Sequence, residues 1–338
     1  MTPEDMLRRG FEAATQRVEP TPGGLDAIRH RIAHHHRLRR RISMGLASLA
    51  SAAAATVTAV VVATASCAPP PAPGPSIPPG GTSGSPTSTP TSGPGITDGV
   101  PVYYLGAANG RTVLYREFHT LRLPDDSLTA RISAAVTEMM RPNATDPDYG
   151  SHWPTGASVR SVRIEGAVAV VDLGGVATNS VGAEVAQLSV EQVIWTVTAV
   201  GADAGSPLEG IRIQVDGSSP AELWGHVAIG GVLRRGDATS VQAPVWLVSP
   251  QQGDTVGRTF TVHVDGRVFE ATAQLRVVRA DGTVVHDDFV TLSNGAPSRG
   301  EAFVELTVPP GQYTVEAFYY SAMDGSVQGM DDHDITVS

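Results

Sequence analysis

The balance of hydrophobic and polar positions changes along the chain and marks segments with different expected structures. Residues 42–67 are apolar or small and carry no charge, whereas residues 68–99 consist mainly of Pro, Gly, Ser and Thr. Residues 100–236 mix helical and strand periodicities, and residues 243–338 alternate apolar and polar positions in short runs. The pattern therefore predicts an anchor, a linker and two folded domains.

The uncharged segment is long enough to cross a membrane as one helix. Residues 43–66 would form a helix about 36 Å long, against a hydrocarbon core of roughly 30 Å. Four arginines stand between positions 37 and 41, directly before this segment. Because cytoplasmic flanks carry an excess of arginine, we expect a single-pass protein of the cell membrane. Residues 1–41 would be cytoplasmic and the C-terminal domains extracytoplasmic.

The only cysteine, Cys67, offers an alternative to this anchor. Thr64-Ala65-Ser66-Cys67 resembles a bacterial lipobox, in which the cysteine is lipidated after cleavage. That motif prefers Leu, Val or Ile at the position of Thr64, and 41 residues before the apolar stretch are long for a signal peptide. We therefore predict an intact span and keep lipidation of Cys67 as the alternative. A single cysteine excludes an intrachain disulfide.

The segments on either side of the anchor are expected to differ. Residues 68–99 contain ten prolines and only two large apolar residues, Ile77 and Ile96, which predicts an extended linker. In residues 2–18, apolar positions recur at helical spacing, which predicts a short amphipathic helix. The cytoplasmic tail is therefore either a solvated segment with a topogenic charge cluster or a docking site for a cytoplasmic partner.

The first folded segment, residues 100–236, has the pattern of an α+β domain. Apolar residues at helical spacing predict two helices, near 128–139 and 185–200. Short runs rich in Val, Ile and Tyr predict strands, which are expected at 101–105, 112–118, 159–164, 168–173 and 211–215.

The second folded segment, residues 243–338, has the pattern of an all-β domain. Turn dipeptides such as Asp281-Gly282 and Asn294-Gly295 separate its short alternating runs. Seven strands without a helix predict a β-sandwich, with strands at 245–248, 260–264, 273–278, 283–285, 302–308, 313–319 and 334–337.

Taken in order, the elements of residues 100–236 resemble the GerMN domain of bacterial sporulation and germination proteins and of actinobacterial envelope lipoproteins. The resemblance implies an extracytoplasmic module that associates with other proteins or with the envelope and has no known chemistry of its own. It rests on Val102-Tyr103-Tyr104, Trp153-Pro154-Thr155-Gly156, Val168 to Asp172-Leu173, Gln187-Leu188-Ser189, Trp195-Thr196-Val197-Thr198 and Val215-Asp216-Gly217.

Residues 243–338 are similar to the immunoglobulin-like domain that follows GerMN domains in bacterial spore-germination-associated proteins. This second resemblance implies a role in adhesion or scaffolding, and nothing in the residues themselves specifies spores. It rests on Val248-Ser249-Pro250, Gly253, Val256, Gly266 to Ala271, Asp281-Gly282, Gly311 and Ser321 to Ser326.

Charge and motifs narrow the functional classes. The formal net charge is −10, and after residue 41 the chain carries fifteen Arg against twenty-nine Asp and Glu, which argues against nucleic-acid binding. The motifs G-x-S-x-G, S-x-x-K and H-E-x-x-H do not occur in the sequence. We therefore predict a protein that is not an enzyme and has no catalytic residues, no cofactor and no metal.

Two local patterns in the second domain bear on a metal site and on a solvent-facing strand. The run Asp331-Asp332-His333-Asp334 offers metal ligands, but it lacks the spaced ligands and the turn glycine of a calcium loop. A solvated strand entry is therefore expected there. His263 alternates with apolar neighbours, which predicts that it faces solvent together with Thr261 and Asp265.

The tryptophans supply the candidate interface residues, because aromatic side chains are enriched where proteins bind partners. Trp195 lies within the second predicted helix of the first domain and is assigned to the core. Trp224 and His226 follow a predicted strand, and Trp153 precedes another. These three residues are therefore the candidate interface.

The favoured hypothesis is a non-catalytic, membrane-anchored envelope protein whose outer domains bind a protein partner or cell-wall glycan. One alternative is transmembrane signalling through the cytoplasmic docking helix. Another is a cell-wall hydrolase with an unrecognised site. Signalling requires that the span stays intact, because cleavage before Cys67 would remove the cytoplasmic tail.

Overall fold

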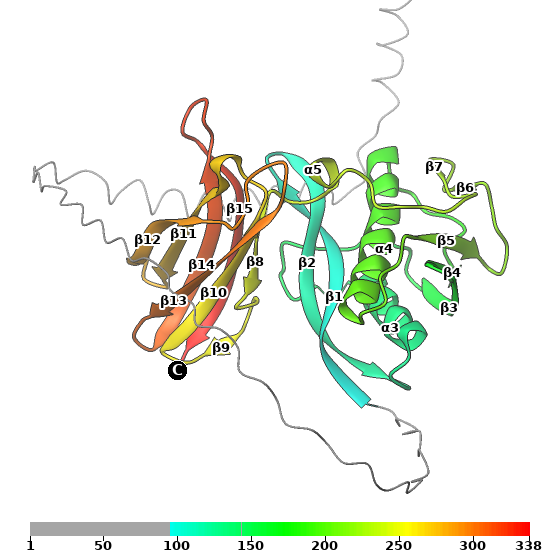
Figure 1. The fold of residues 1–338 in the computed structure, drawn as a ribbon, viewed down its shortest axis with the longest axis horizontal. Helices are drawn as coiled ribbons and strands as arrows, with labels where there is room; N and C mark the ends of the chain where they lie inside the picture. The colour runs from blue at the N-terminus through cyan, green and yellow to red at the C-terminus, as the bar shows by residue number, and fades with distance from the viewer. Residues whose placement is uncertain (1–94, 143) are drawn as a thin grey trace, which may run out of the picture. The chain divides into compact units, whose positions relative to one another are not determined.

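The computed structural model describes residues 95–142 and 144–338, which belong to one compact unit. Within that unit an α+β domain is followed by a β-sandwich (Figure 1). None of the helices in these ranges is long and apolar enough to cross a membrane. The predicted tail and span, with Cys67, lie outside the described residues, as does most of the predicted linker.

A long antiparallel ribbon opens the first domain. Strands β1 (Gly95–Ala108) and β2 (Arg111–Leu123) pair along almost their whole length. The turn between them has positive φ at both Asn109 and Gly110, 52° and 74°, as a tight hairpin of right-handed twist requires. Strand β1 begins inside the predicted linker, because Ile96 pairs with Arg122 on β2.

Two helices lie between this ribbon and a small sheet (Figure 1). Helix α3 (Leu128–Met140) is capped by the Ser127 hydroxyl, which accepts the Ala130 N–H. Helix α4 (Ala183–Asp203) connects the parallel strands of the sheet β3-β4-β5. The sheet consists of β3 (Ser158–Glu165), β4 (Val168–Gly174) and β5 (Gly210–Val215), followed by β6 (Glu222–Leu223), β7 (Val227–Ala228) and the short helix α5 (Ala238–Val241).

The second domain is a sandwich of two sheets around one apolar core. One sheet has the order β13-β10-β8, from β8 (Val245–Ser249), β10 (Thr259–Gly266) and β13 (Gly300–Thr307). The other has the order β12-β11-β14-β15-β9, from β9 (Thr255–Val256), β11 (Thr272–Arg279), β12 (Val284–Thr291), β14 (Gly311–Tyr320) and β15 (Val327–Val337). A single 3₁₀ turn, η1 (Phe269–Ala271), precedes β11.

Strand β1 is apolar on both faces because each face is covered by a different core. Val102 and Tyr104 belong to the core of the first domain. Tyr103 and Leu105, which alternate with them, belong to a separate apolar cluster with Trp246 of the sandwich. This second cluster is the junction of the two domains. The continuous run Val102-Tyr103-Tyr104-Leu105 is thus the pattern of a strand buried on both sides.

The helices and strands that the pattern predicts are present in both domains. One large difference lies at β15, which is predicted as four residues and spans eleven. The polar residues Asp331 and His333 stand in its middle and are buried. These two polar side chains contact the first domain and are not exposed to solvent. Hydropathy alone therefore underestimates the length of the strand.

Candidate binding site at the junction of the two domains

Three aromatic rings connect helix α4 with the sandwich through strand β1. The Tyr103 ring centroid lies 5.8 Å from that of Trp195 on α4 and 6.5 Å from that of Trp246 on β8. Both distances are within the range of favourable aromatic pairs. All three side chains are buried. The position of β8 is therefore coupled by packing to the main helix of the first domain.

A buried carboxylate, Asp265 on β10, joins two arginines at the same junction. Arg116 on β2 approaches it with 3.3 Å between Nη2 and Oδ2, and Arg299 with 3.0 Å between Nη1 and Oδ1. The Arg299 guanidinium also lies 3.7 Å from the centroid of the Trp246 ring, as a cation–π contact. Burial lowers the pKa of Arg299, and the Asp265 charge opposes that shift.

The prediction that Asp265 faces solvent is therefore wrong. Its carboxylate is covered by Arg116 of the first domain and by Arg299. His263, two residues earlier on the same strand, is half-buried and stacks on Phe303 with 4.1 Å between ring centroids. Buried and exposed side chains alternate along β10 as predicted from the sequence, but the outward-facing Asp265 at its end contacts the first domain.

A second buried carboxylate, Asp331 on β15, also receives a contact from each domain. The Tyr149 hydroxyl of the first domain donates to Oδ1, and the Leu247 N–H of β8 donates to Oδ2 at 2.6 Å. The Tyr149 ring stacks on Tyr115 of β2, with 4.5 Å between centroids. The expectation of a solvated strand entry at Asp331 is therefore wrong, because Tyr149 replaces water as the hydrogen-bond donor.

Asp146, Asp331 and His333 lie close enough together to hold a metal ion, since their ligand atoms are all within 4.8 Å of one another. Like Asp331, both Asp146 and His333 are oriented by hydrogen bonds within the chain. Asp146 accepts the Asp148 N–H at 2.7 Å, and the His333 Nδ1–H donates to the Pro250 carbonyl at 2.8 Å. The chain's own hydrogen bonds thus account for the positions of all three side chains.

Burial also raises the pKa values of carboxyl groups in and beside this cluster. It raises the pKa of Asp146 to about 7, although the Asp148 N–H and the charge of His333 oppose the shift. Burial and the neighbouring charge of Asp331 raise the pKa of Asp332 to about 8. The cluster therefore carries less negative charge at neutral pH than its composition suggests.

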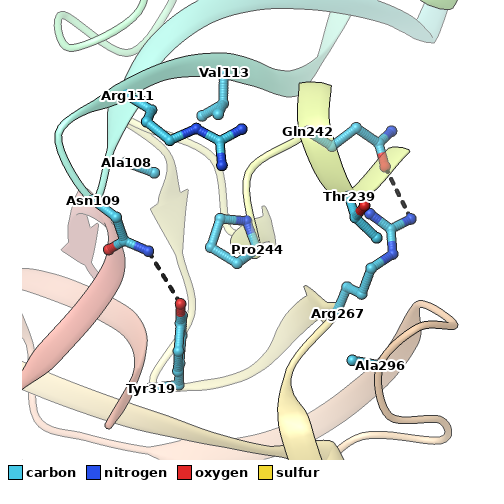
Figure 2. A pocket seen from close by; sticks show the side chains of 10 residues that line it. All are labelled: Ala108, Asn109, Arg111, Val113, Thr239, Gln242, Pro244, Arg267, Ala296 and Tyr319. Carbon is cyan, nitrogen blue, oxygen red and sulfur yellow. Dashed lines mark hydrogen bonds between the residues drawn. The ribbon is translucent and has the colours of Figure 1, made fainter. Parts of the chain in front are cut away.

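A cleft of about 270 Å³ opens beside the junction, between the turn of the ribbon and the sandwich (Figure 2). Arg111 enters it from the ribbon and Arg267 from the segment after β10. Across the cleft, the Asn109 side-chain amide donates to the Tyr319 hydroxyl at 3.0 Å, and Asn109 Oδ1 accepts the Gly329 N–H at 2.7 Å. Residues of both domains therefore form one concave site.

Two family models match the chain along the two domains described above. Residues 101–220 match the family described as sporulation and spore germination. Residues 244–326 match the immunoglobulin-like domain of bacterial spore germination. The chain carries a GerMN domain followed by an immunoglobulin-like domain. The junction and the cleft are therefore formed between a GerMN domain and its immunoglobulin-like neighbour.

Solved structures with low sequence identity are also similar to parts of the chain. The tandem GerMN domains of the sporulation protein GerM from Bacillus subtilis are 15% identical, with a TM-score of 0.32, over 46% of this chain and 49% of that one. The chain thus spans about half the length of that structure. A putative lipoprotein from Clostridium perfringens is 16% identical, with a TM-score of 0.30, over 44% and 93%. Among curated proteins, none matches the chain.

The candidate interface residues of the GerMN domain lie apart from the cleft and none of them lines it. The Trp153 and Trp224 rings pack against each other with 5.1 Å between centroids. Trp153 is buried, and the Trp224 indole N–H donates to the Val176 carbonyl at 2.7 Å. His226 is exposed. An interface there remains a prediction, and only His226 and the open edge of Trp224 could contribute to it.

The arginines of the cleft were not identifiable as site residues from the sequence. Arg111 follows the Asn109-Gly110 turn, and Arg267 follows the end of a predicted strand. Each position by itself is typical of a solvated arginine. Only the packing of the immunoglobulin-like domain against the ribbon brings them to one cleft. The apolar run on both faces of β1 was the one sequence signal that a second domain packs there.

Proposed function

We propose that this chain is a non-catalytic, membrane-tethered envelope protein whose GerMN and immunoglobulin-like domains bind a partner together, as one unit. The partner is an envelope protein or cell-wall glycan. The observation that carries the proposal is the cleft between the domains, because a site formed by Arg111 of one domain and Arg267 of the other requires both. Binding pockets occur preferentially at such domain interfaces.

The location of the domains follows from the sequence before residue 95. The apolar segment 42–67 and its arginine flank support a cytoplasmic N-terminus, and the linker 68–99 supports domains held away from the membrane. Lipidation of Cys67 would give the same outward placement through a different anchor. The germination-like families of both domains agree with an envelope role.

The environment of His119 fits a structural role better than a role in hydrolysis. His119 is buried, and its Nε2 forms a 2.7 Å hydrogen bond with Glu117. Glu117 in turn accepts the N–H groups of Thr145 and Asp146, at 2.9 and 2.8 Å. This carboxylate and imidazole therefore hold the segment that leads to the junction, which is a structural task.

Cross-linking in intact cells tests the proposal directly. The full-length protein serves as bait, and the matched control keeps residues 1–99 but carries an unrelated folded domain in place of residues 100–338. We expect a defined envelope protein or cell-wall fragment to be recovered with the bait and to be missing from the control. Recovery of the same lipids and bulk membrane proteins with both would refute the proposal.

Transmembrane signalling is separated from binding alone by a second variant. Deletion of residues 2–30 removes the predicted cytoplasmic helix and retains the arginines at 37–41. A binding protein should keep its cross-linked partner and its cellular phenotype after this deletion. Loss of the phenotype with the partner retained would favour signalling.

A further inference from the structure

The cleft carries two arginines that form no ion pair with any carboxylate of the described residues. Arg111 donates to the Ser240 carbonyl at 2.6 Å, and Arg267 donates to the Pro297 carbonyl at 2.9 Å and to Gln242 Oε1 at 3.3 Å. All three acceptors are neutral oxygens. They hold the two guanidinium groups in place and contribute no negative charge of their own.

The two arginines that contact Trp246 differ from these two, because they have a carboxylate partner. Arg116 and Arg299 share Asp265, as described above. Within the described ranges, no carboxylate oxygen forms an ion pair with Arg111 or Arg267, and no Asp or Glu lines the cleft. Asp237, at the start of α5, is exposed; its carboxylate accepts hydrogen bonds from Thr239 and Ser240, and the Arg267 charge also contributes to lowering its pKa. Asp237 therefore offsets part of the Arg267 charge from a distance, without an ion-pair contact.

The cleft is positive although the chain as a whole is acidic. After residue 41 the chain has fifteen Arg against twenty-nine Asp and Glu. The two arginines thus place positive charge at one concave site of an acidic chain. Two guanidinium groups that face one concave space form a site for planar or tetrahedral oxyanions, which accept several N–H bonds at once.

The remaining polar groups of the cleft can also donate. The Tyr319 hydroxyl accepts from Asn109, so its own proton is available to a ligand. The Gln242 amide nitrogen is likewise available, because only the Oε1 atom of that side chain accepts from Arg267. Figure 2 shows these side chains around the same space as the two arginines. The volume of about 270 Å³ exceeds the roughly 150 Å³ cavity that holds a benzene molecule.

We infer that this cleft binds an anionic group, a carboxylate or a phosphate, held between Arg111 of the GerMN domain and Arg267 of the immunoglobulin-like domain. The inference rests on the proposed binding function and names the chemistry of its ligand. Because one arginine comes from each domain, the bound anion bridges the junction. Its binding should therefore raise the unfolding temperature of the two domains together.

Isothermal titration of the full-length protein in detergent, at low ionic strength, tests this inference. Glycerol phosphate is the phosphate probe, and N-acetyl-dialanine with a free carboxylate is the carboxylate probe. Glycerol and the amidated dipeptide are their neutral counterparts. We expect a charged probe to bind and its neutral counterpart to fail, and the charged probe that binds identifies the ligand class.

Arginine variants assign the binding to the cleft. Arg111→Gln and Arg267→Gln should each weaken binding about tenfold or more, because each removes charged hydrogen bonds to the anion. Arg122→Gln and Arg258→Gln are matched controls, since both arginines are exposed, one in each domain, and should leave binding unchanged. Circular dichroism confirms the fold of each variant. Arg111 stands on an exposed turn, so its variant remains informative if Arg267→Gln is unstable.

Two results would overturn the inference. One is that neither charged probe binds the wild-type protein, and the other is that the double arginine variant binds as well as the wild type. The cellular cross-linking experiment separates this failure from failure of the proposed function. A double variant that still recovers the partner would leave the binding function intact and remove the anion site.

Discussion

The Arg116 guanidinium on β2 pairs with the Asp265 carboxylate on β10 across the domain junction, with 3.3 Å between Nη2 and Oδ2. Arg299 of the immunoglobulin-like domain binds the other oxygen of the same carboxylate. One buried acid thus compensates two arginines that belong to different domains. The junction depends on this acid more than on either arginine.

Asp265→Asn should destabilise the protein by about 3–5 kcal/mol, because it leaves two largely buried guanidinium groups without a counter-charge. Urea unfolding of the wild type and the variant measures this difference. Asp288→Asn, an exposed position on β12, is the control and should change stability by less than about 0.5 kcal/mol. Equal effects of the two substitutions would contradict a buried charge network at the junction.

Trp246→Ala should uncouple the two domains. The side chain is 1% exposed and contacts both the Tyr103 ring and Arg299. Its loss should cost about 3–5 kcal/mol. In scanning calorimetry we expect a single transition for the two wild-type domains and two separate transitions for the variant. Two transitions already present in the wild type would show that the junction does not couple unfolding.

Gly106→Ala should destabilise the protein by about 1–3 kcal/mol through overpacking. A Cβ at Gly106 would lie 2.8 Å from the Tyr115 ring and 3.0 Å from the Tyr149 ring, so the stacked pair must shift. Gly150→Ala is the matched control, because a Cβ there meets no atom within 4 Å. Thermal unfolding of both variants measures the difference, and equal melting temperatures would refute the close approach.

Glu191→Gln should become increasingly stabilising, relative to the wild type, as the pH rises from 4 to 7. Burial raises the pKa of the Glu191 carboxyl above its usual range, although the Gly236 N–H and the Trp195 indole N–H donate to it. The folded state thus retains a proton that the unfolded state loses from about pH 4 upward, so wild-type stability falls across that window.

Glutamine replaces the protonated carboxyl and does not titrate, so the variant escapes this loss. Urea unfolding at several pH values measures the difference, with Glu184→Gln on the exposed first turn of the same helix as control. A difference between Glu191→Gln and the wild type that shrinks toward pH 7 would show that burial does not raise the pKa of Glu191.

Local periodicity predicted the main helices and strands of both domains, because most of them bury one face against their own domain. The helix near 128–139 and the strand at 260–264 both appear at the predicted positions. The resemblance to GerMN and immunoglobulin-like domains was also correct. These features depend on contacts between residues close in sequence, or on the alternation of apolar and polar positions along a strand.

The site could not be predicted in the same way, because its residues meet only after the two domains pack together. Asp265 and Asp331 are polar positions that hydropathy assigns to solvent, and in the structure the opposite domain supplies their hydrogen-bond partners. Trp153, a candidate interface residue, is buried within its own domain, while the interface near it stays a prediction. Exposure inferred from one segment is unreliable wherever a second domain covers it.

The burial of β1 on both faces has a consequence for biosynthesis. Tyr103 and Leu105 leave the ribosome more than a hundred residues before Ala243 and Trp246, which cover them in the finished protein. Until the immunoglobulin-like domain is complete, a folded GerMN domain exposes this apolar surface to other chains. A chain that stops after residue 236 would retain that surface permanently and should self-associate. The C-terminal domain is therefore also the cover that keeps the N-terminal domain from aggregating during its own synthesis.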